Sequence, residues 1–327
     1  MLEPTAPRIF TLSPCEEREK RVSKTILIGT RGSQLATTQS GMMRDQLAAH
    51  WGDAIDVRLE IISTKGDVNQ QSLSQIGGQG VFTREIERAL LDARVQLAVH
   101  SLKDLPTEMD PRLQLSAIPV REDTRDVLVT ANGGGLDDLP DGARVGTGST
   151  RRQAQLLALR PDLQFADLRG NVDTRLSKVT EGDLDAVVLA AAGLHRLGHG
   201  DKISAYLDSL LMLPAPGQGA LGLQTLITDT DAHHHVQALD DAATHAGVTA
   251  ERAFLASLGG GCRAPIAAWG RMNGDQLQLD GTVLSADGSQ VCRAVVSGAP
   301  EEADDLGRRL GEQLKAEGAA ALLADFV

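Results

Sequence analysis

Two adjacent arginines follow a glycine-rich stretch in the middle of the chain. Residues 145–152 (VGTGSTRR) read as a turn between a strand and a helix. Free backbone N–H groups and the helix dipole attract anions at such a turn, and Arg151 and Arg152 add positive charge. The Gly-Lys-Ser/Thr ending of a nucleotide P-loop is missing. The stretch therefore predicts an anion site of another kind, with a structural turn and solvated arginines as the open alternative.

The following turn repeats this arrangement. Residues 168–171 (LRGN) come after the next apolar strand, and Arg175 falls in the first turn of the next helix. The planar fork of a guanidinium group binds a carboxylate bidentately. Two neighbouring turns that both offer arginine, in a chain that is acidic elsewhere, predict a cleft for a polycarboxylate.

The N-terminal part offers a matching surface. Residues 30–33 (TRGS) lie at a strand-to-helix turn, and residues 100–106 (HSLKDLP) follow the end of a strand. Lys103 can bind an anion, whereas Asp104 can move a proton or stabilise a cation. A surface loop with an ordinary ion pair is the open alternative.

One cysteine and several histidines need separate consideration. The glycines of residues 259–263 (GGGCR) would leave the thiol of Cys262 accessible, as a covalent anchor or an idle thiol. Residues 233–235 (HHH) point in different directions on a helix, which indicates a solvated face and no metal site. His195 is expected to pack at a helix end.

Composition limits the possible functions. The 327 residues carry 32 basic and 44 acidic side chains, a net charge of −12, which argues against nucleic acid or an anionic membrane as partner. No apolar run reaches the roughly 18 residues needed to cross a bilayer. Three unpaired cysteines indicate a reducing compartment, so we expect a cytoplasmic protein. Residues 1–24 read as a polar, disordered tail without a secretory core.

Alternating apolar strands and helices then predict α/β domains with mainly parallel sheets, whose ligand loops lie at the carboxyl ends of the strands. In the first part we expect elements at Thr25–Gly29, Ser33–Trp51, Val57–Ser63, Val81–Asp92 and Leu97–Leu102. The second series comprises Asp126–Thr130, Arg144–Thr147, Ser149–Arg160, Leu163–Leu168, Val172–Glu181 and Asp185–Leu189.

Leu211–Leu213 and Ala220–Leu226 are further apolar runs, and the segment between them, residues 214–219 (PAPGQG), suits a return crossing to the first domain. A third, α+β part is expected to contain Thr249–Leu258, Ile266–Arg271, Gln276–Ser285, Gln290–Ser297 and a helix from Glu302 to about Leu323. The predicted domains are residues 25–120 with 218–240, residues 121–217, and residues 242–327.

Eight collinear segments from Thr25 onward resemble the porphobilinogen deaminase family. They are TRGSQLA at 30–36, STKGD at 63–67, HSLKDLP at 100–106, REDTRDV at 121–127, GTGSTRRQAQL at 146–156, LRGNVDTRL at 168–176, APGQGALG at 215–222 and GGGCRAPI at 259–266. The resemblance implies two domains similar to type II periplasmic binding proteins and a small C-terminal α+β domain. It also implies a dipyrromethane cofactor joined to Cys262 by a thioether.

The resemblance implies a transferase of tetrapyrrole biosynthesis, active as a monomer. Such an enzyme joins four porphobilinogen units with loss of ammonia and then hydrolyses off hydroxymethylbilane. Asp104 matches the catalytic aspartate. Cofactor contacts are implied for Ser101, Lys103, Asp104, Thr147, Ser149, Arg151, Arg152, Arg169 and Arg175, and substrate contacts for Arg31, Ser33, Gln39, Arg196 and Gln218.

Departures from the family pattern are local. Arg84 stands where Lys is frequent, Arg263 where Gln is common, and Asp173 where small or polar residues are usual. Two other functions remain as alternatives at this stage. A non-enzymatic carboxylate-binding protein would use the same cleft without a covalent group. A cysteine acyltransferase or hydrolase would need a partner base for Cys262, which the sequence does not identify.

Overall fold

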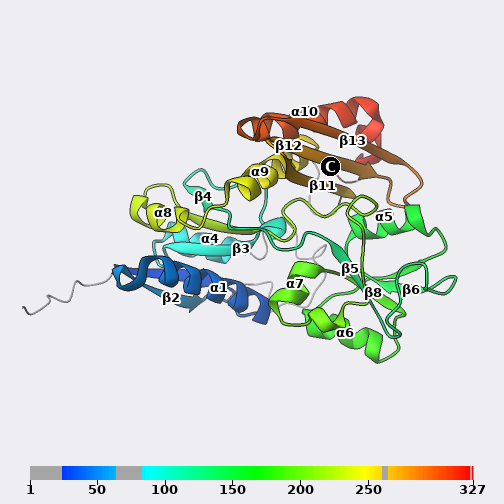
Figure 1. The fold of residues 1–327 in the computed structure, drawn as a ribbon, viewed down its shortest axis with the longest axis horizontal. Coiled ribbons are helices and arrows are strands. Elements are labelled where there is room, and N and C mark those ends of the chain that lie inside the picture. Colours follow the sequence, from blue (N-terminus) through cyan, green and yellow to red (C-terminus); the bar gives the residue numbers. More distant parts are fainter. Residues whose placement is uncertain (1–23, 64–82, 260–263, 325, 327) are drawn as a thin grey trace, which may run out of the picture.

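Three β-sheets, each covered by helices, organise the chain (Figure 1). The computed structural model describes residues 24–63, 83–259, 264–324 and 326. Two of the sheets have five strands and the third has three. Short 3-10 turns connect several elements, at Gly52–Ala54, Leu102–Asp104, Gly200–Lys202 and Pro300–Glu302.

The first sheet has the strand order β2-β1-β3-β10-β4. Its strands are β1 (Lys24–Thr30), β2 (Ile55–Ile61), β3 (Leu97–Ser101), β4 (Leu113–Ala117) and β10 (Leu221–Leu226). Its helices are α1 (Gln34–Trp51), α4 (Arg84–Leu91) and α8 (Thr230–Gln237). Buried aliphatic side chains fill both faces of the sheet, because each face is covered by helices. The expected tail is one residue too long, since Lys24 already belongs to β1.

The second sheet has the order β7-β6-β8-β5-β9. Its strands are β5 (Asp126–Thr130), β6 (Arg144–Gly146), β7 (Gln164–Ala166), β8 (Ala186–Ala190) and β9 (Ala205–Tyr206). Its helices are α5 (Thr150–Leu159), α6 (Val172–Thr180) and α7 (Ala191–Arg196). Ser149 and Asn171 cap α5 and α6 with their side-chain oxygens, which fixes where the two helices begin.

The two five-stranded sheets share one plan. In each, three parallel strands are followed by an antiparallel strand, β10 or β5, that enters from the other half of the molecule. The expected α/β class with type II periplasmic-binding-protein-like halves is therefore confirmed. The expectation of mainly parallel sheets is wrong only at β10 and β5, because a chain that crosses between the halves enters each sheet in the direction opposite to its neighbours.

The third sheet is antiparallel and packs on two helices. It contains β11 (Ile266–Asn273), β12 (Gln276–Leu284) and β13 (Val291–Gly298), covered by α9 (Ala242–Ser257) and α10 (Ala303–Leu314). The buried ring of Phe254 belongs to its core. The expected C-terminal α+β unit is thus confirmed.

Two helix predictions in this unit need correction. Helix α9 begins at Ala242 rather than Thr249, because Asp241 caps it by accepting a hydrogen bond from the Thr244 amide. The expected single helix to about Leu323 ends at Leu314. A π-helical turn, Lys315–Ala319, follows with Gly318 at φ 112°, and α11 (Ala320–Leu322) completes the segment.

The two segments that cross between the halves, residues 118–125 and 214–220, meet at a buried carboxylate. Glu251 of α9 accepts hydrogen bonds from both terminal nitrogens of Arg121, at 2.6 and 2.9 Å. It also accepts from the amides of Gly217, at 2.6 Å, and Gly270, at 2.8 Å. One side chain therefore ties both crossing segments to the third unit.

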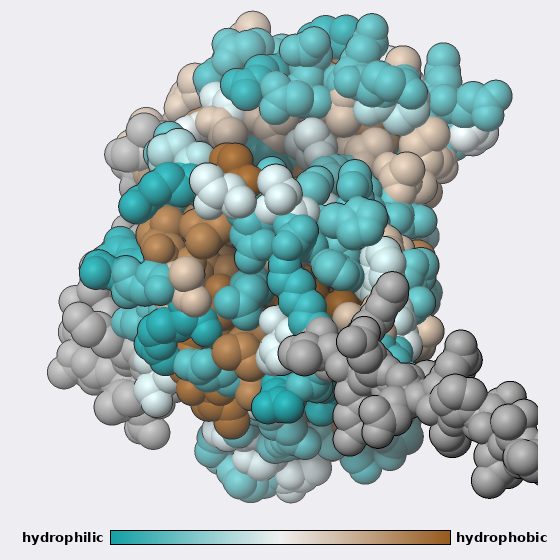
Figure 2. Space-filling view, turned by 90° about the vertical axis from the view of Figure 1, so that its left-hand side faces the viewer, coloured by the Kyte–Doolittle hydropathy of each residue, from teal (hydrophilic) through white to brown (hydrophobic). Residues whose placement is uncertain are grey.

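One face of the molecule is mainly polar. Figure 2 shows the face at the left of Figure 1, where hydrophilic side chains surround a hydrophobic area that lies mainly left of the centre. Among the described residues, no helix combines the length and the apolar character that a membrane span requires.

The Glu251 junction predicts a large loss of stability when its charge is removed. Glu251→Gln leaves the buried Arg121 without a counter-charge, which typically costs about 3–5 kcal/mol. We expect the thermal midpoint to fall by about 5–10 °C, measured by differential scanning fluorimetry. Asp304→Asn, which removes an exposed ion pair with Arg308, serves as the control and should change it by about 1–2 °C or less. Equal effects of the two substitutions would contradict this account.

Candidate functional site

Five of the expected site residues line one small pocket at the carboxyl ends of β1 and β3. The pocket has a volume of about 80 Å³, and its walls include Arg31, Ser33, Gln39, Ser101 and Asp104. Ser33 caps α1, and the amide of Gln39 is 2.9 Å from the hydroxyl of Ser101. The turn after β1 and the turn after β3 thus present an arginine and an aspartate to the same space.

A neutral histidine forms another wall of this pocket. Burial lowers the pKa of His100 to about 4. Its Nε2 is 2.9 Å from Oε1 of Gln224, whose amide nitrogen donates to Glu87. Because that contact orients the amide of Gln224, Nε2 of His100 carries the proton. His100 therefore adds no positive charge beside Asp104.

A second group of expected residues surrounds Asp126, at the start of β5. Arg152 donates to Oδ1 of Asp126 from Nε and Nη2, at 3.0 and 2.7 Å, and Nη2 of Arg151 lies 2.8 Å from Oδ2. Gln218 donates to the same Oδ1 at 2.9 Å and accepts from Nζ of Lys103 at 3.3 Å. Side chains from the first sheet, the second sheet and the second crossing segment therefore meet here.

Arg151 and Arg152 are more buried than solvated binding arginines would be. Their exposed fractions are 4% and 7%. Arg151 also donates to the carbonyl of Leu213 at 2.6 Å, and Arg152 to the carbonyl of Val188 at 2.9 Å. The open alternative of a turn with solvated arginines is therefore wrong for this pair.

Positive charge exceeds negative charge around Asp126. Burial alone would raise the pKa of Asp126, but Arg151 and Arg152 outweigh it and hold the pKa far below its usual range. Burial, followed by repulsion from Arg152, lowers the pKa of Lys103 to about 8. The carboxylate of Asp126 thus faces two guanidinium groups and the ammonium group of Lys103, whose charged form is disfavoured by burial and by Arg152. A carboxylate-bearing ligand fits this imbalance, because a further negative charge would favour all three cations.

The remaining residues of the second half lie at the two turns that the sequence singled out. Thr147 accepts a hydrogen bond from the amide of Ser149, and Ser149 caps α5. Arg169 is exposed and pairs with Asp167 at 2.8 Å. Arg175 donates to the carbonyl of Gly170 at 2.9 Å.

Arg175 is close enough to the other groups for their charges to act on it. Burial lowers the pKa of Arg175, repulsion from Arg152 lowers it further, and Asp104 opposes both. The pKa of Lys103 likewise responds to Asp104 and to Arg152. Lys103, the neighbour of Asp104 in the chain, is also joined through Gln218 to Asp126, so the pocket around Asp104 and the cluster around Asp126 adjoin each other.

Arg196, at the end of α7, borders this site from the second half. Its Nη2 donates to the carbonyl of Gly219 at 2.7 Å. Among the described residues its buried Nε has no hydrogen-bond partner. A buried N–H without a partner is costly, so this donor is available to an acceptor group of a ligand.

Cys262 and Arg263 lie outside the described residues, as do Thr64–Asp67 of the STKGD motif. The structure does describe α9, the helix that precedes them in the chain. Arg252 of α9 donates to the carbonyls of Leu105 at 2.9 Å and Pro106 at 2.7 Å, directly after Asp104. This contact fixes α9 against the loop that carries Asp104.

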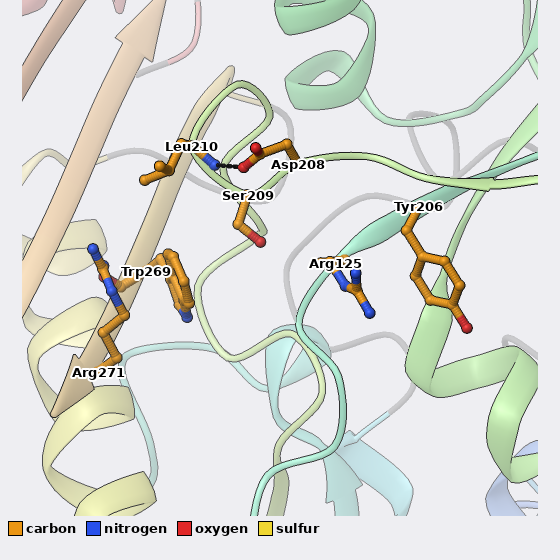
Figure 3. Close-up of a pocket in the computed structure, with 7 residues that line it drawn as sticks. All are labelled: Arg125, Tyr206, Asp208, Ser209, Leu210, Trp269 and Arg271. Carbon is orange, nitrogen blue, oxygen red and sulfur yellow. Dashed lines mark hydrogen bonds between the residues drawn. The ribbon is translucent and has the colours of Figure 1, made fainter. Parts of the chain in front are cut away.

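A second cavity lies apart from the expected residues. It has a volume of about 570 Å³ and is located between β9 and β11. Figure 3 shows its walls, which include Arg125 beside Tyr206 on one side and Arg271 beside Trp269 on the other. Both arginines already pair with carboxylates, Asp123 and Asp280.

Several structural residues of the site were missed from the sequence. Asp126 and Arg121 stand within the REDTRDV motif, but neither was assigned a role. Glu251 and Arg252 lie in a helix that the sequence predicted, but neither residue was assigned a role. In the described part of the chain, no group of three or more His, Cys, Asp or Glu side chains is arranged to hold a metal ion.

Two family models match the chain. The model described as "Porphobilinogen deaminase, dipyromethane cofactor binding domain" matches residues 26–234, and "Porphobilinogen deaminase, C-terminal domain" matches residues 246–316. The porphobilinogen deaminase of Roseiflexus castenholzii is 49% identical over 301 residues, covering 91% of this chain and 98% of that protein. That of Syntrophobacter fumaroxidans is 46% identical over 304 residues, covering 93% and 98%.

Solved structures also match, at lower similarity. The periplasmic VFT2 domain of BvgS from Bordetella pertussis aligns with a TM-score of 0.39 and 18% identity. The alignment covers 65% of this chain and 85% of that domain.

The charge imbalance predicts an unusually acidic lysine. In protein free of bound polycarboxylate, acetylation of Lys103 should reach half its maximal rate near pH 8, because burial and Arg152 favour the neutral amine. The measurement is the pH profile of acetylation by peptide mass spectrometry, with Lys202 as the reference in the same sample. A half-maximal rate at Lys103 near pH 10.5 would contradict the account.

The lowered pKa of Lys103 also determines how the free energy of unfolding changes with pH. Between about pH 8 and 10.5 the unfolded chain binds more protons at Lys103 than the folded protein does, so Lys103 makes stability rise with pH in this window. Lys103→Met should abolish that part of the rise.

Proposed function

Because the chain belongs to the porphobilinogen deaminase family, we propose that the residues around Asp104 and Asp126 form its cofactor and substrate site. The protein is a transferase that condenses four porphobilinogen molecules, with loss of ammonia, on a dipyrromethane primer and then releases hydroxymethylbilane. A non-enzymatic carboxylate-binding protein is not favoured. The observation that carries the assignment is the set of contacts across the two halves, in which Lys103 donates to Gln218 and Gln218 donates to Asp126, the partner of Arg151 and Arg152.

Several residues would hold the cofactor. When bound, dipyrromethane supplies a pyrrole α-carbon to which the first substrate can be joined. Cys262 provides the thioether sulfur, and the excess positive charge around Asp126 receives acetate and propionate groups. The contacts are assigned to Ser101, Lys103, Asp104, Thr147, Ser149, Arg151, Arg152, Arg169 and Arg175.

Asp104 is assigned the catalytic role. Its carboxylate lines the pocket that also contains Arg31, so a substrate carboxylate on Arg31 would place the pyrrole ring near Asp104. A carboxylate in that position can accept a hydrogen bond from the pyrrole N–H and stabilise positive charge that develops when ammonia leaves. It can also accept the proton that the joined ring must lose.

The substrate carboxylates are assigned to the pocket and its border. Arg31, Ser33 and Gln39 contribute from the first half, Gln218 from the second crossing segment, and Arg196 from the second half. Porphobilinogen carries an acetate and a propionate, which suit guanidinium groups that offer parallel N–H donors.

The organisation of the molecule completes the proposal. Residues 25–120 with 218–240 form the first domain, residues 121–217 the second and residues 242–327 the third. The two crossing segments, which run between the five-stranded sheets, support these boundaries. We assign the enzyme to the cytoplasm as a monomer, consistent with its acidic, mainly polar surface.

Removal of the negative charge of Asp104 tests its role. Asp104→Asn should lower kcat by about 100-fold or more, because general acid–base and electrostatic assistance are each worth about that much. Folding and cofactor attachment should persist, as judged by thermal midpoint and intact mass. Asp110→Asn is the matched control on an exposed turn and should retain activity. Near-normal single-turnover rates in Asp104→Asn would refute the assignment.

The thioether is tested by mass. Purified protein should be heavier than its sequence by one dipyrromethane and should give the coloured reaction of pyrroles with acidic dimethylaminobenzaldehyde. Cys262→Ser should show neither property and should be inactive. Cys292→Ser, which changes a partly buried thiol in the third sheet, should retain both. Active protein with an unmodified Cys262 would contradict the cofactor assignment.

A further inference from the structure

A histidine next to Arg196 is held at both ring nitrogens. Nδ1 of His195 lies 3.1 Å from Oε1 of Glu122, in the first crossing segment. Nε2 lies 2.9 Å from the hydroxyl of Tyr206, in β9. His195 therefore connects the end of α7 to two other elements, which goes beyond the helix-end packing expected from the sequence.

Both partners of His195 are themselves fixed. The guanidinium group of Arg125 lies 4.0 Å from the centre of the Tyr206 ring, a cation–π contact. Figure 3 shows this ring beside Arg125, with the hydroxyl directed away from the cavity. The second partner, Glu122, also accepts a hydrogen bond from the amide of Asp123 at 2.9 Å. The ring of His195 is thus held between anchored groups.

Arg196 is fixed at one end only. Its Nη2 and the amide of Glu122 both donate to the carbonyl of Gly219, at 2.7 and 3.2 Å. Gly219 has φ 83°, and a Cβ there would come within 2.4 Å of the carbonyl oxygen of Glu122, so only glycine allows this contact. By contrast, Nε of Arg196 has no hydrogen-bond partner among the described residues. The direction of that donor depends on the backbone at the end of α7.

We propose that His195 is a positioning residue: its bonds to Glu122 and Tyr206 hold the end of α7 so that Nε of Arg196 points at a substrate carboxylate. This inference rests on the substrate-binding role proposed above for Arg196. A six-residue helix has little stability of its own, so tertiary contacts must fix its last turn. Loss of the contacts would leave the donor in place but poorly directed, which weakens binding more than chemistry.

The expected signature is a change in KM with little change in kcat. His195→Ala should raise KM for porphobilinogen about three- to tenfold, the effect of losing about one hydrogen bond, and should change kcat by less than about twofold. Tyr206→Phe removes one of the two contacts and should have a smaller effect in the same direction. The side chain of His195→Gln can still reach one partner, so its KM should lie between that of the unchanged protein and that of His195→Ala.

His199→Ala is the matched control. His199 has the same side-chain exposure as His195, 27%, and also contacts a carboxylate, Asp173, at 3.0 Å. It lies just beyond α7, and its side chain contacts α6 rather than Glu122 or Tyr206, so its removal should leave KM unchanged. An equal rise of KM in both variants would overturn the inference, because any histidine near α7 would then have the same effect.

The double variant separates positioning from general stability. If His195 acts through Arg196, then His195→Ala should have no further effect on KM in an Arg196→Gln background. Additive effects would overturn the inference. A raised KM in Arg196→Gln with a normal KM in His195→Ala would overturn the positioning role of His195 but leave the substrate role of Arg196 intact. A normal KM in Arg196→Gln would refute the substrate role of Arg196, and with it this inference.

Discussion

The arrangement of the site depends on one buried carboxylate. Asp126 has no exposed surface and is surrounded by Arg151, Arg152 and Gln218. Burial of an ion is costly unless other charges and hydrogen bonds replace the water. The two guanidinium groups compensate for the lost hydration of the carboxylate and leave one positive charge in excess. The folded protein therefore holds a buried region of net positive charge that favours anions before any ligand arrives.

Asp126 also joins elements that are distant in the sequence. It opens β5, directly after the first crossing segment, and Gln218 reaches it from the second. Glu251 ties the same two segments to α9 from the other side. The three sheets consequently meet at two buried carboxylates, one facing the site and one facing the third unit. The hydrogen bonds and ion pairs of this junction require one arrangement of the segments, which keeps the turns of the two halves in register.

The sequence predicted the turns well and their partners poorly. Glycine-rich turns after apolar strands are local features, so the positions of Ser33, Ser149 and Arg175 at helix starts followed from spacing. The contacts of Asp126 and Glu251 join residues far apart in the chain, and no local pattern reports such a pairing. Strands β4 and β9 were missed for a related reason. They are short, and pairing with β10 and β5, which are distant in the sequence, stabilises them as strands. The resemblance to the family supplied the ligand, which the spacing could not identify.

The arginines differ in burial, and this difference suits a site that must hold one group permanently and others in turn. Arg151 and Arg152 are buried and bonded to fixed carbonyls, so their geometry cannot change without breaking several bonds. Arg169 is exposed and held by one exposed carboxylate, a contact that costs little to break. A growing chain of rings carries more carboxylates than the site has arginines, and contacts must therefore be exchanged as it lengthens. The buried pair is suited to the ligand that stays, and the exposed side chain to those that pass.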